Sequence, residues 1–230
     1  MIDLNKTQEL FVSTISDNPK HVFKNLKIFD RLGISGIHFD IMDGNFVPRF
    51  GLYPELLAEL RSETELPIEV HLMTKNPDPY IDTLVKAGAN RIIVHLEALA
   101  HPFKTISLIK ESGAAAGIAL NPSTGIADAK HLIQEVSLIM LMAINPGIPK
   151  HTFIPSTIPK LIELKKTLVE FGSDAKIGID GGVTFDNAKS LFQNGANLLI
   201  CGSGTIFKQE RSIEENIITL VSRISSQSSG

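Results

Sequence analysis

Short β-rich runs alternate with longer helical patterns from one end of the chain to the other. We expect strands at residues 10–15, 35–42, 67–72, 91–96, 115–120, 137–143, 176–180 and 197–202. Helical patterns lie between and after them, for example at 52–61, 80–87, 105–111, 126–134, 159–171, 186–194 and 213–225. Eight such strand–helix units within 230 residues favour an α/β protein built as one closed (β/α)8 TIM barrel. On this pattern alone, an open doubly wound sheet stays the alternative.

Three of the connections share one design, in which an amphipathic pattern ends at a glycine before an apolar run. These glycines are Gly33, Gly88 and Gly195. Glycine tolerates the left-handed conformation that ends a helix, so the design predicts helices that lead into parallel strands. The run 138–144 is apolar throughout, as expected of a strand covered on both faces. No Gly-x-Gly-x-x-Gly follows the first expected strand, so the usual dinucleotide signal is missing.

Charge and cysteine content narrow the classes of protein. The chain has 22 basic and 25 acidic residues, so it carries no basic excess that would bind nucleic acid. The longest apolar run is too short to cross a bilayer, and the first residues do not resemble a signal peptide. The single cysteine, Cys201, excludes an intrachain disulfide and is typical of a reducing compartment. We therefore predict a cytoplasmic protein without a membrane partner. Its barrel domain would span residues 1–224, with a polar tail over 225–230.

The second expected strand carries the strongest candidate for chemistry. Side chains alternate along a strand, so His38 and Asp40 share one face. Reactive residues of such barrels lie at the carboxyl ends of strands. An imidazole and a carboxylate that point into a barrel are costly to bury unless a metal or hydrogen bonds compensate. A hydrogen-bonded core pair is therefore the alternative to a pair of metal ligands.

Two further strand ends favour a metal site. His71 lies near the end of the third expected strand, and Asp180 ends the seventh. Together with His38 and Asp40 they would converge near the barrel axis as four ligands, with the two carboxylates on opposite sides. The sequence does not identify the divalent ion, because this ligand set suits zinc, iron(II), manganese or cobalt.

Glycines after the last two strands point to an anionic substrate. Gly181 and Gly182 follow the seventh expected strand, whereas Gly202, Ser203 and Gly204 follow the eighth. Loops at these places in barrels commonly bind phosphate through backbone N–H groups and a helix N-terminus. The alternative is that they are ordinary turn glycines. Asn145-Pro-Gly147, after the sixth strand, is a candidate for a further wall of this site.

Taken together, these motifs resemble the ribulose-phosphate 3-epimerase family over nearly the whole chain. Their order and spacing make the resemblance specific. The matching segments are Val12-Ser-Thr-Ile-Ser16, His38-Phe-Asp-Ile-Met-Asp-Gly-Asn-Phe-Val-Pro48, Val70-His-Leu-Met73, Lys75-Asn-Pro77, Ala87-Gly-Ala89, Val94-His-Leu-Glu97, Asn121-Pro122 with Thr124, Met142-Ala-Ile-Asn-Pro-Gly147, Phe153-Ile-Pro155, Asp180-Gly-Gly182 and Gly195-Ala-Asn197.

The resemblance implies a barrel of the ribulose-phosphate-binding type and a metal-dependent 3-epimerase. It implies a metal held by His38, Asp40, His71 and Asp180, with Asp40 and Asp180 as the acid/base pair. One aspartate would remove the C3 proton of a ketose phosphate, and the other would return a proton to the opposite face of a metal-stabilised 2,3-enediolate. The implied substrate contacts are Ser13, His71, Met42, Met73, Met142, Gly147, Lys150, Gly181, Gly182, Gly202, Ser203 and Gly204. The family also implies a homo-oligomer.

The sequence departs from the family pattern in loops that would contact substrate. Pro149-Lys150-His151 stands where the family has Gly-Gly-Gln, so backbone donors are lost, and Lys150 would either replace them or be a solvated lysine. Gly202-Ser-Gly-Thr-Ile-Phe207 is one residue longer than usual, and Pro48-Arg-Phe-Gly-Leu52 replaces a more polar segment. We expect a supporting polar role for His95 and Glu97, and no catalytic role for Cys201.

The leading hypothesis is the conversion of D-ribulose 5-phosphate to D-xylulose 5-phosphate. The nearest alternative keeps the reaction on a hexulose 6-phosphate such as D-allulose 6-phosphate. A sugar-phosphate lyase is less favoured, because Asp128-Ala-Lys130 lacks the second aspartate of the Asp-x-Lys-x-x-Asp decarboxylase motif. A Schiff-base aldolase would need an inward-facing strand lysine, and we expect no strand to supply one. A non-catalytic binding barrel would be expected to have lost a ligand or an aspartate, and none is lost.

Overall fold

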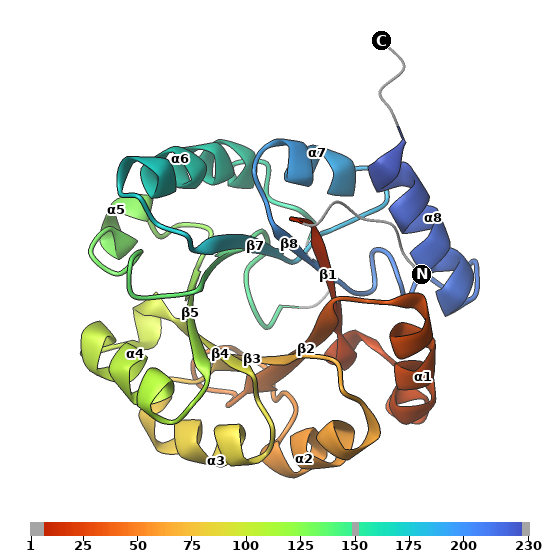
Figure 1. The fold of residues 1–230 in the computed structure, drawn as a ribbon, viewed down its shortest axis with the longest axis horizontal. Helices are drawn as coiled ribbons and strands as arrows, with labels where there is room; N and C mark the ends of the chain where they lie inside the picture. Colours follow the sequence, from red (N-terminus) through yellow and green to blue (C-terminus); the bar gives the residue numbers. More distant parts are fainter. Residues whose placement is uncertain (1–6, 149–151, 227–230) are drawn as a thin grey trace.

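The computed structural model describes residues 7–148 and 152–226. Within them, eight parallel strands close a barrel in which each strand pairs with its sequence neighbours and β8 returns to β1 (Figure 1). The open-sheet alternative is therefore wrong. The strands are β1 (Glu9–Ser13), β2 (Gly36–Met42), β3 (Ile68–Met73), β4 (Arg91–His95), β5 (Ala115–Leu120), β6 (Leu138–Met142), β7 (Lys176–Asp180) and β8 (Leu198–Cys201).

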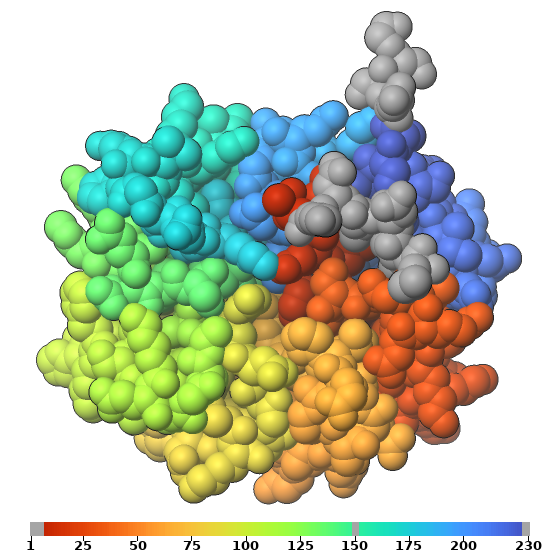
Figure 2. Space-filling model, viewed as in Figure 1, coloured from red at the N-terminus to blue at the C-terminus, as the bar shows by residue number. Residues whose placement is uncertain are grey.

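The helices form a ring outside this barrel (Figure 1). They are α1 (Val22–Leu32), α2 (Pro54–Glu63), α3 (Ile81–Lys86), α4 (Pro102–Glu111), α5 (Ile126–Ala129), α6 (Thr157–Glu170), α7 (Ala188–Gln193) and α8 (Ile213–Ser225). Most helices that follow one another in sequence also contact one another, and α8 closes the ring against α1. The colour order around the edge of Figure 2 follows the same circuit.

Strand alternation separates an outer apolar layer from a mixed interior. Ile37, Phe39 and Ile41 of β2 are buried within the large core cluster shared by the strands and the surrounding helices. The opposite residues of the strands form a second, smaller apolar cluster, which includes Phe11 and Met140. Because both faces are covered, whole strands are buried, as the near-continuous apolar runs predict.

The expected helix–glycine–strand connections are confirmed. Gly33, Gly88 and Gly195 have φ values of 76°, 106° and 119°, a region that side chains with a Cβ rarely adopt. The observed helix boundaries differ from the expected ones by several residues in two cases. Helix α4 begins three residues earlier than expected, because Pro102 fits the first helical turn, where its missing N–H costs nothing. Helix α5 stops at Ala129, and the rest of the expected helix continues as tight turns.

The C-terminal boundary falls near the expected place. Ser225 is the last residue of α8, while residues 227–230 of the expected tail lie outside the described residues. A single domain over 1–224 stays a prediction, since residues 1–6 also lie outside them. In the part of the chain that the structure describes, no helix is long and apolar enough to span a membrane.

Candidate active site

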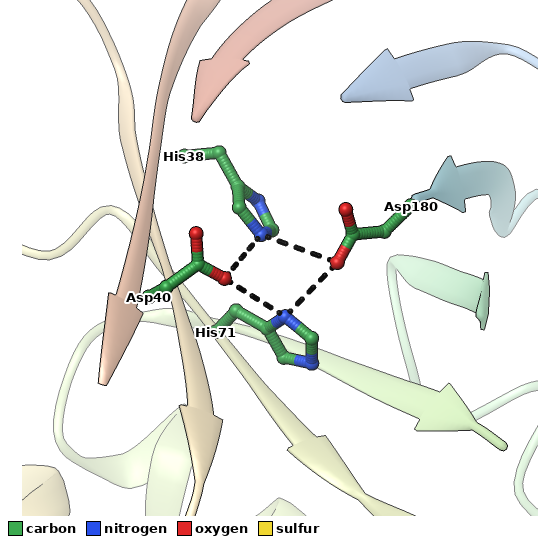
Figure 3. Close-up of side chains that lie close together, drawn as sticks. All are labelled: His38, Asp40, His71 and Asp180. Carbon is green, nitrogen blue, oxygen red and sulfur yellow. Dashed lines mark ion pairs between the residues drawn. The ribbon is translucent and has the colours of Figure 1, made fainter. Parts of the chain in front are cut away.

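Four side chains from three strands meet inside the barrel near the carboxyl ends of its strands. His38 and Asp40 come from β2, His71 from β3 and Asp180 from β7 (Figure 3). Parallel register brings the first three together, because Asp40 and His71 are paired across β2 and β3. Asp180 reaches the same point from the other side of the barrel, beyond β1 and β8. The arrangement confirms that these residues converge, as the strand positions predict.

Two nitrogens and two carboxylate oxygens surround one point. His38 Nε2 lies 3.2 Å from an Asp40 oxygen and 3.8 Å from an Asp180 oxygen. His71 Nδ1 lies 3.4 Å from each of the same two oxygens. Tetrahedral ligands at about 2.1 Å from a cation are separated by about 3.4 Å. The ligand atoms therefore have the mutual spacing that a metal ion requires.

The two imidazoles give the stronger sign of a metal site. Both are fully buried, and both His38 Nε2 and His71 Nδ1 lack a hydrogen-bond partner. Buried polar atoms without a partner are costly, and each of these atoms faces the shared point. A divalent ion there would satisfy both nitrogens and balance the two carboxylates. The donor set thus fits a divalent metal ion.

The electrostatics of the cluster favour positive charge at the same point. Burial alone would lower the pKa of His38, but Asp40, Glu69 and Asp180 together raise it well above its ordinary value. Burial opposes ionisation of Asp40 as well, yet His38 and His71 hold the pKa of that carboxyl far below its usual range. A metal ion displaces such protons when it binds.

Glu69 orients His38 from behind. Its Oε1 accepts a 2.7 Å hydrogen bond from His38 Nδ1, and its Oε2 accepts one of 2.8 Å from Arg91. An ionised carboxylate only accepts hydrogen bonds, so the proton of neutral His38 lies on Nδ1 and Nε2 is left to face the ligand point. Sequence reasoning gave Glu69 no role. The signal for one was its inward-facing position two residues before His71.

A separate polar chain runs from His71 to the edge of the barrel. His71 Nε2 lies 2.9 Å from His95 Nε2, and His95 Nδ1 lies 3.3 Å from Glu97 Oε2. Burial and electrostatic repulsion from His71 lower the pKa of His95 to about 4, although the hydrogen bond with Glu97 acts in the opposite direction. His95 is therefore neutral at ordinary pH. The expectation that His95 and Glu97 support the site agrees with these contacts.

A cavity of about 710 Å³ opens above the four-residue cluster. Among the expected site residues, those that line it are Ser13, Asp40, Met42, Met73, Met142, Gly147, Asp180, Gly181, Gly182, Gly202, Ser203 and Gly204. His38 and His71 lie behind this surface, with none of their area exposed. The expected contact of His71 with substrate is therefore not seen in the lining. Lys150 lies outside the described residues.

The wall of the cavity beside β7 and β8 is made of closely packed glycine loops. Gly181 and Gly182 have φ values of 93° and 64°. A Cβ on Gly204 would lie 2.4 Å from the carbonyl oxygen of Val183, so the loops after β7 and β8 approach backbone to backbone. These glycines are thus required by the backbone itself, whether or not they bind phosphate. Their position on one wall leaves several main-chain groups beside the cavity.

Three methionines line the cavity together with the acids of the four-residue cluster. Met42 and Met73 are register partners on β2 and β3, and they pack with Val47 in a small apolar cluster. Met142, at the end of β6, is 2 % exposed. These apolar side chains limit water near the carboxylates. Arg49, which sequence reasoning passed over, also lines the cavity and lies in the loop after β2.

Ser13 and Cys201 occupy different environments. The Ser13 hydroxyl donates a 2.9 Å hydrogen bond to Asp40 Oδ2, so this residue holds one of the acids as well as lining the cavity. Cys201 is fully buried in β8, and burial raises the pKa of its thiol to about 12. It is therefore a core residue, as expected.

Comparisons with known proteins give one family. A model described as the ribulose-phosphate 3 epimerase family matches residues 9–207. The chain is 41% identical over 187 residues to a ribulose-phosphate 3-epimerase of Bacillus subtilis (strain 168), covering 81% of this chain and 86% of that protein. It is 38% identical over 178 residues to the Escherichia coli (strain K12) protein of the same name, covering 77% and 79%. A chloroplastic ribulose-5-phosphate-3-epimerase of Arabidopsis thaliana is 37% identical over 193 residues, covering 83% and 69%.

Solved structures show the same architecture in more distant proteins. A mutant tryptophan synthase alpha-subunit from Pyrococcus furiosus superposes with a TM-score of 0.68 over 94% of this chain and 96% of that one. Its sequence identity is only 16%. At that level the likeness shows the barrel fold and carries nothing about the reaction.

Proposed function

The chain belongs to the ribulose-phosphate 3-epimerase family and is an isomerase, and we propose that it interconverts D-ribulose 5-phosphate and D-xylulose 5-phosphate. The proposal includes the site residues named from the sequence, with Asp40 and Asp180 as the proton-transfer pair. The one change is that His71 serves as a metal ligand and not as a substrate contact, because it is absent from the cavity lining. A homo-oligomeric state, which the family resemblance implies, stays a prediction.

The placement of the two aspartates is the observation that carries this proposal. Asp40 and Asp180 come from strands that are not neighbours, and both line the same cavity. Inversion at a carbon atom needs one group to take a proton from one face and another to return a proton to the opposite face. Two acids that enter one cavity from different strands meet that requirement, whereas adjacent acids on one strand would not.

The surroundings of the aspartates suit their proposed work. Asp40 is held by the Ser13 hydroxyl, and its side chain is 6 % exposed. Asp180 is 14 % exposed, so each acid keeps access to the cavity while most of its surface is shielded from water. One carboxylate accepts the C3 proton of the ketose phosphate, which leaves an enediolate, and the other carboxyl donates to the opposite face. The two acids exchange these roles in the reverse reaction.

His38 and His71 complete the ligand set with the same two aspartates. A divalent ion bound there would act as a Lewis acid toward the oxygens beside the reacting carbon. The histidines themselves do not reach the cavity, so their role is to fix the ligand point and not to move protons. Met42, Met73 and Met142 exclude water from the reacting face.

The loops after β7 and β8 are the proposed phosphate site. Gly181, Gly182, Gly202, Ser203 and Gly204 place main-chain groups along one wall of the cavity. Backbone N–H groups at such a place can hold an anion without a basic surface. This agrees with a chain whose formal net charge is −3.

A comparison of substrates in one metal-replete preparation tests the function. D-ribulose 5-phosphate and D-allulose 6-phosphate would be supplied separately in D2O, with product and deuterium at C3 followed by NMR. We expect turnover of the pentulose and incorporation of solvent deuterium at C3. Faster turnover of the hexulose would replace the proposed substrate while keeping the reaction. Tight binding of either sugar without exchange at C3 would contradict the epimerase assignment.

A further inference from the structure

The two histidines of the metal cluster use different ring nitrogens. His38 faces the ligand point with Nε2, whereas His71 faces it with Nδ1. A neutral imidazole binds a metal only through the nitrogen that carries no proton. Each ring must therefore keep its proton on the far nitrogen, and each needs a separate partner there to hold it.

His38 has a direct partner. The carboxylate of Glu69 accepts from Nδ1 and leaves Nε2 free, as described above. His71 has no carboxylate at its far nitrogen. Its Nε2 instead meets His95 Nε2 at 2.9 Å. One proton lies between these two nitrogens, and either ring can supply it.

The position of that proton decides whether His71 can bind a metal. If His71 Nε2 donates, its Nδ1 carries a lone pair toward the ligand point. If His95 Nε2 donates instead, neutral His71 must carry its proton on Nδ1, and that N–H points at the metal position. His71 and His95 are both 0 % exposed, so neither ring can replace its hydrogen bond to the other ring by one to solvent. The ring of Phe46, whose centroid lies 4.8 Å from that of His95, covers His95 on one side.

Glu97 determines which ring donates, because it contacts the other nitrogen of His95. Its Oε2 lies 3.3 Å from His95 Nδ1, and a carboxylate can only accept there. Its Oε1 accepts from the backbone N–H of Asn121 at 2.7 Å and from the Thr124 hydroxyl. These bonds fix the carboxylate, and together with His95 they lower the pKa of Glu97 to about 2 against the effect of burial.

We propose that Glu97 is a positioning residue that acts through His95 to hold the metal-binding tautomer of His71. Ionised Glu97 keeps the His95 proton on Nδ1, so His95 Nε2 accepts and His71 Nε2 donates. His71 Nδ1 is then left free for the metal. The inference rests on the proposed metal set and adds the group that prepares one of its ligands. Neither Glu97 nor His95 touches the cavity that holds the substrate.

We call the hydrogen-bonded series Glu97–His95–His71 the relay. The isosteric Glu97→Gln substitution tests it, because the substitution reverses the direction of each hydrogen bond in the relay without changing the shape of the side chain. Asn121 and Thr124 both donate, so they select the amide oxygen and turn the amide NH2 toward His95. His95 Nδ1 must then accept, His95 Nε2 must donate, and His71 is left with its proton on Nδ1. We expect zinc affinity to fall about 10- to 100-fold, the range for the loss of such an outer partner.

The measurements are zinc affinity by chelator competition and long-range 1H–15N NMR of the zinc-loaded histidine rings. In the unmodified protein we expect zinc on His38 Nε2 and His71 Nδ1, with the His95 proton on Nδ1. In Glu97→Gln we expect weaker zinc binding and the His95 proton on Nε2. The matched control is Glu135→Gln, which changes an exposed glutamate paired with Lys110 and should leave both readouts unchanged.

A second variant separates tautomer control from simple packing. His95→Gln keeps one acceptor for His71 and one donor for Glu97, so we expect it to retain more zinc affinity than Glu97→Gln. Zinc binding and ring signals in Glu97→Gln like those of the unmodified protein would overturn the relay. Zinc bound to residues other than His38 and His71 in the unmodified protein would overturn the four-residue metal set and the inference built on it. The proposed function is tested separately, by deuterium exchange at C3.

Discussion

The two ends of the barrel interior treat charge in opposite ways. At the amino ends of the strands, Glu69 meets Arg91 at 2.8 Å, and Glu9 pairs with Lys176. The expectation that no strand supplies an inward-facing lysine is therefore wrong for Lys176, although this residue begins β7 and lies at the end opposite Asp180. At the carboxyl ends, the ion pairs of Asp40 and Asp180 among the described residues are with histidine alone. Lysine and arginine thus balance the negative charge at the amino ends of the strands. At the carboxyl ends no lysine or arginine among the described residues pairs with Asp40 or Asp180, and a divalent ion is the proposed counter-charge.

The difference separates charges that have structural partners from the two acids that we propose to react. Buried charges are tolerated when a partner satisfies them, and the amino end supplies partners from its own strands. The carboxyl end leaves two imidazole nitrogens unpartnered beside two acids that reach the cavity. Glu69 joins both ends, since one oxygen contacts Arg91 and the other orients His38. The ion pair at the amino ends of the strands therefore also fixes the orientation of His38 in the four-residue cluster.

Asp180→Asn should have the largest effect, because it removes one acid of the reactive end. We expect turnover and C3 proton exchange to fall by about 10²- to 10⁴-fold, the usual contribution of a positioned acid or base. Deuterium incorporation from D2O measures the loss, and phosphate binding should persist through the glycine loops. Asp174→Asn changes an exposed acid before β7 and serves as the control. Undiminished exchange in Asp180→Asn would contradict the two-aspartate proposal.

Arg91→Met tests the balanced end. It leaves Glu69 almost fully buried without its cation, so we expect a loss of about 3–5 kcal/mol in the free energy of unfolding. Lys176→Met is the comparison. This lysine keeps 43% of its side chain exposed, so its removal should cost less than about 1 kcal/mol. Urea unfolding of both variants in the presence of a chelator measures the difference. Equal losses would show that burial does not set the strength of these pairs.

Asp43→Asn asks whether every acid at the carboxyl end is reactive. Asp43 accepts from three backbone N–H groups, those of Asn45, Phe46 and Lys75, at 2.7 to 2.9 Å. Burial works against its charge, yet these groups hold the pKa of the carboxyl below its ordinary value. The substitution would place an amide NH2 against the Lys75 N–H, and we expect a loss of about 1–2 kcal/mol in stability with little change in C3 exchange.

The pH dependence of that loss follows from the direction of the shift. A lowered pKa in the folded state stabilises the protein above the unfolded pKa of about 3.9, and this contribution is lost as pH falls through the folded value. The stability difference between Asp43→Asn and the unmodified protein should therefore be constant from about pH 5 to 8 and shrink below about pH 4. Unfolding curves at pH 7, 5 and 3.5 measure it. A difference that grows on acidification would contradict the assignment.

Much of the fold could be predicted because its signals are local. Short β-rich runs between helical patterns located all eight strands, and the glycines at helix ends located three connections. The expected helix over 126–134 was too long, because apolar spacing alone does not separate a helix from a series of tight turns. In the structure Ile126, Ala129 and Leu132 are still buried, so the pattern reported burial correctly and backbone geometry poorly.

The candidate site likewise has features that the local sequence determines and features that depend on the tertiary structure. The sequence by itself determined which residues face inward, since side chains alternate strictly along a strand, and so it identified His38, Asp40, His71 and Asp180. It could not determine at what height neighbouring strands meet, because that depends on barrel stagger. Only the tertiary structure placed Glu69 behind His38 and His95 behind His71, and thereby decided which nitrogen of each ring faces the ligand point.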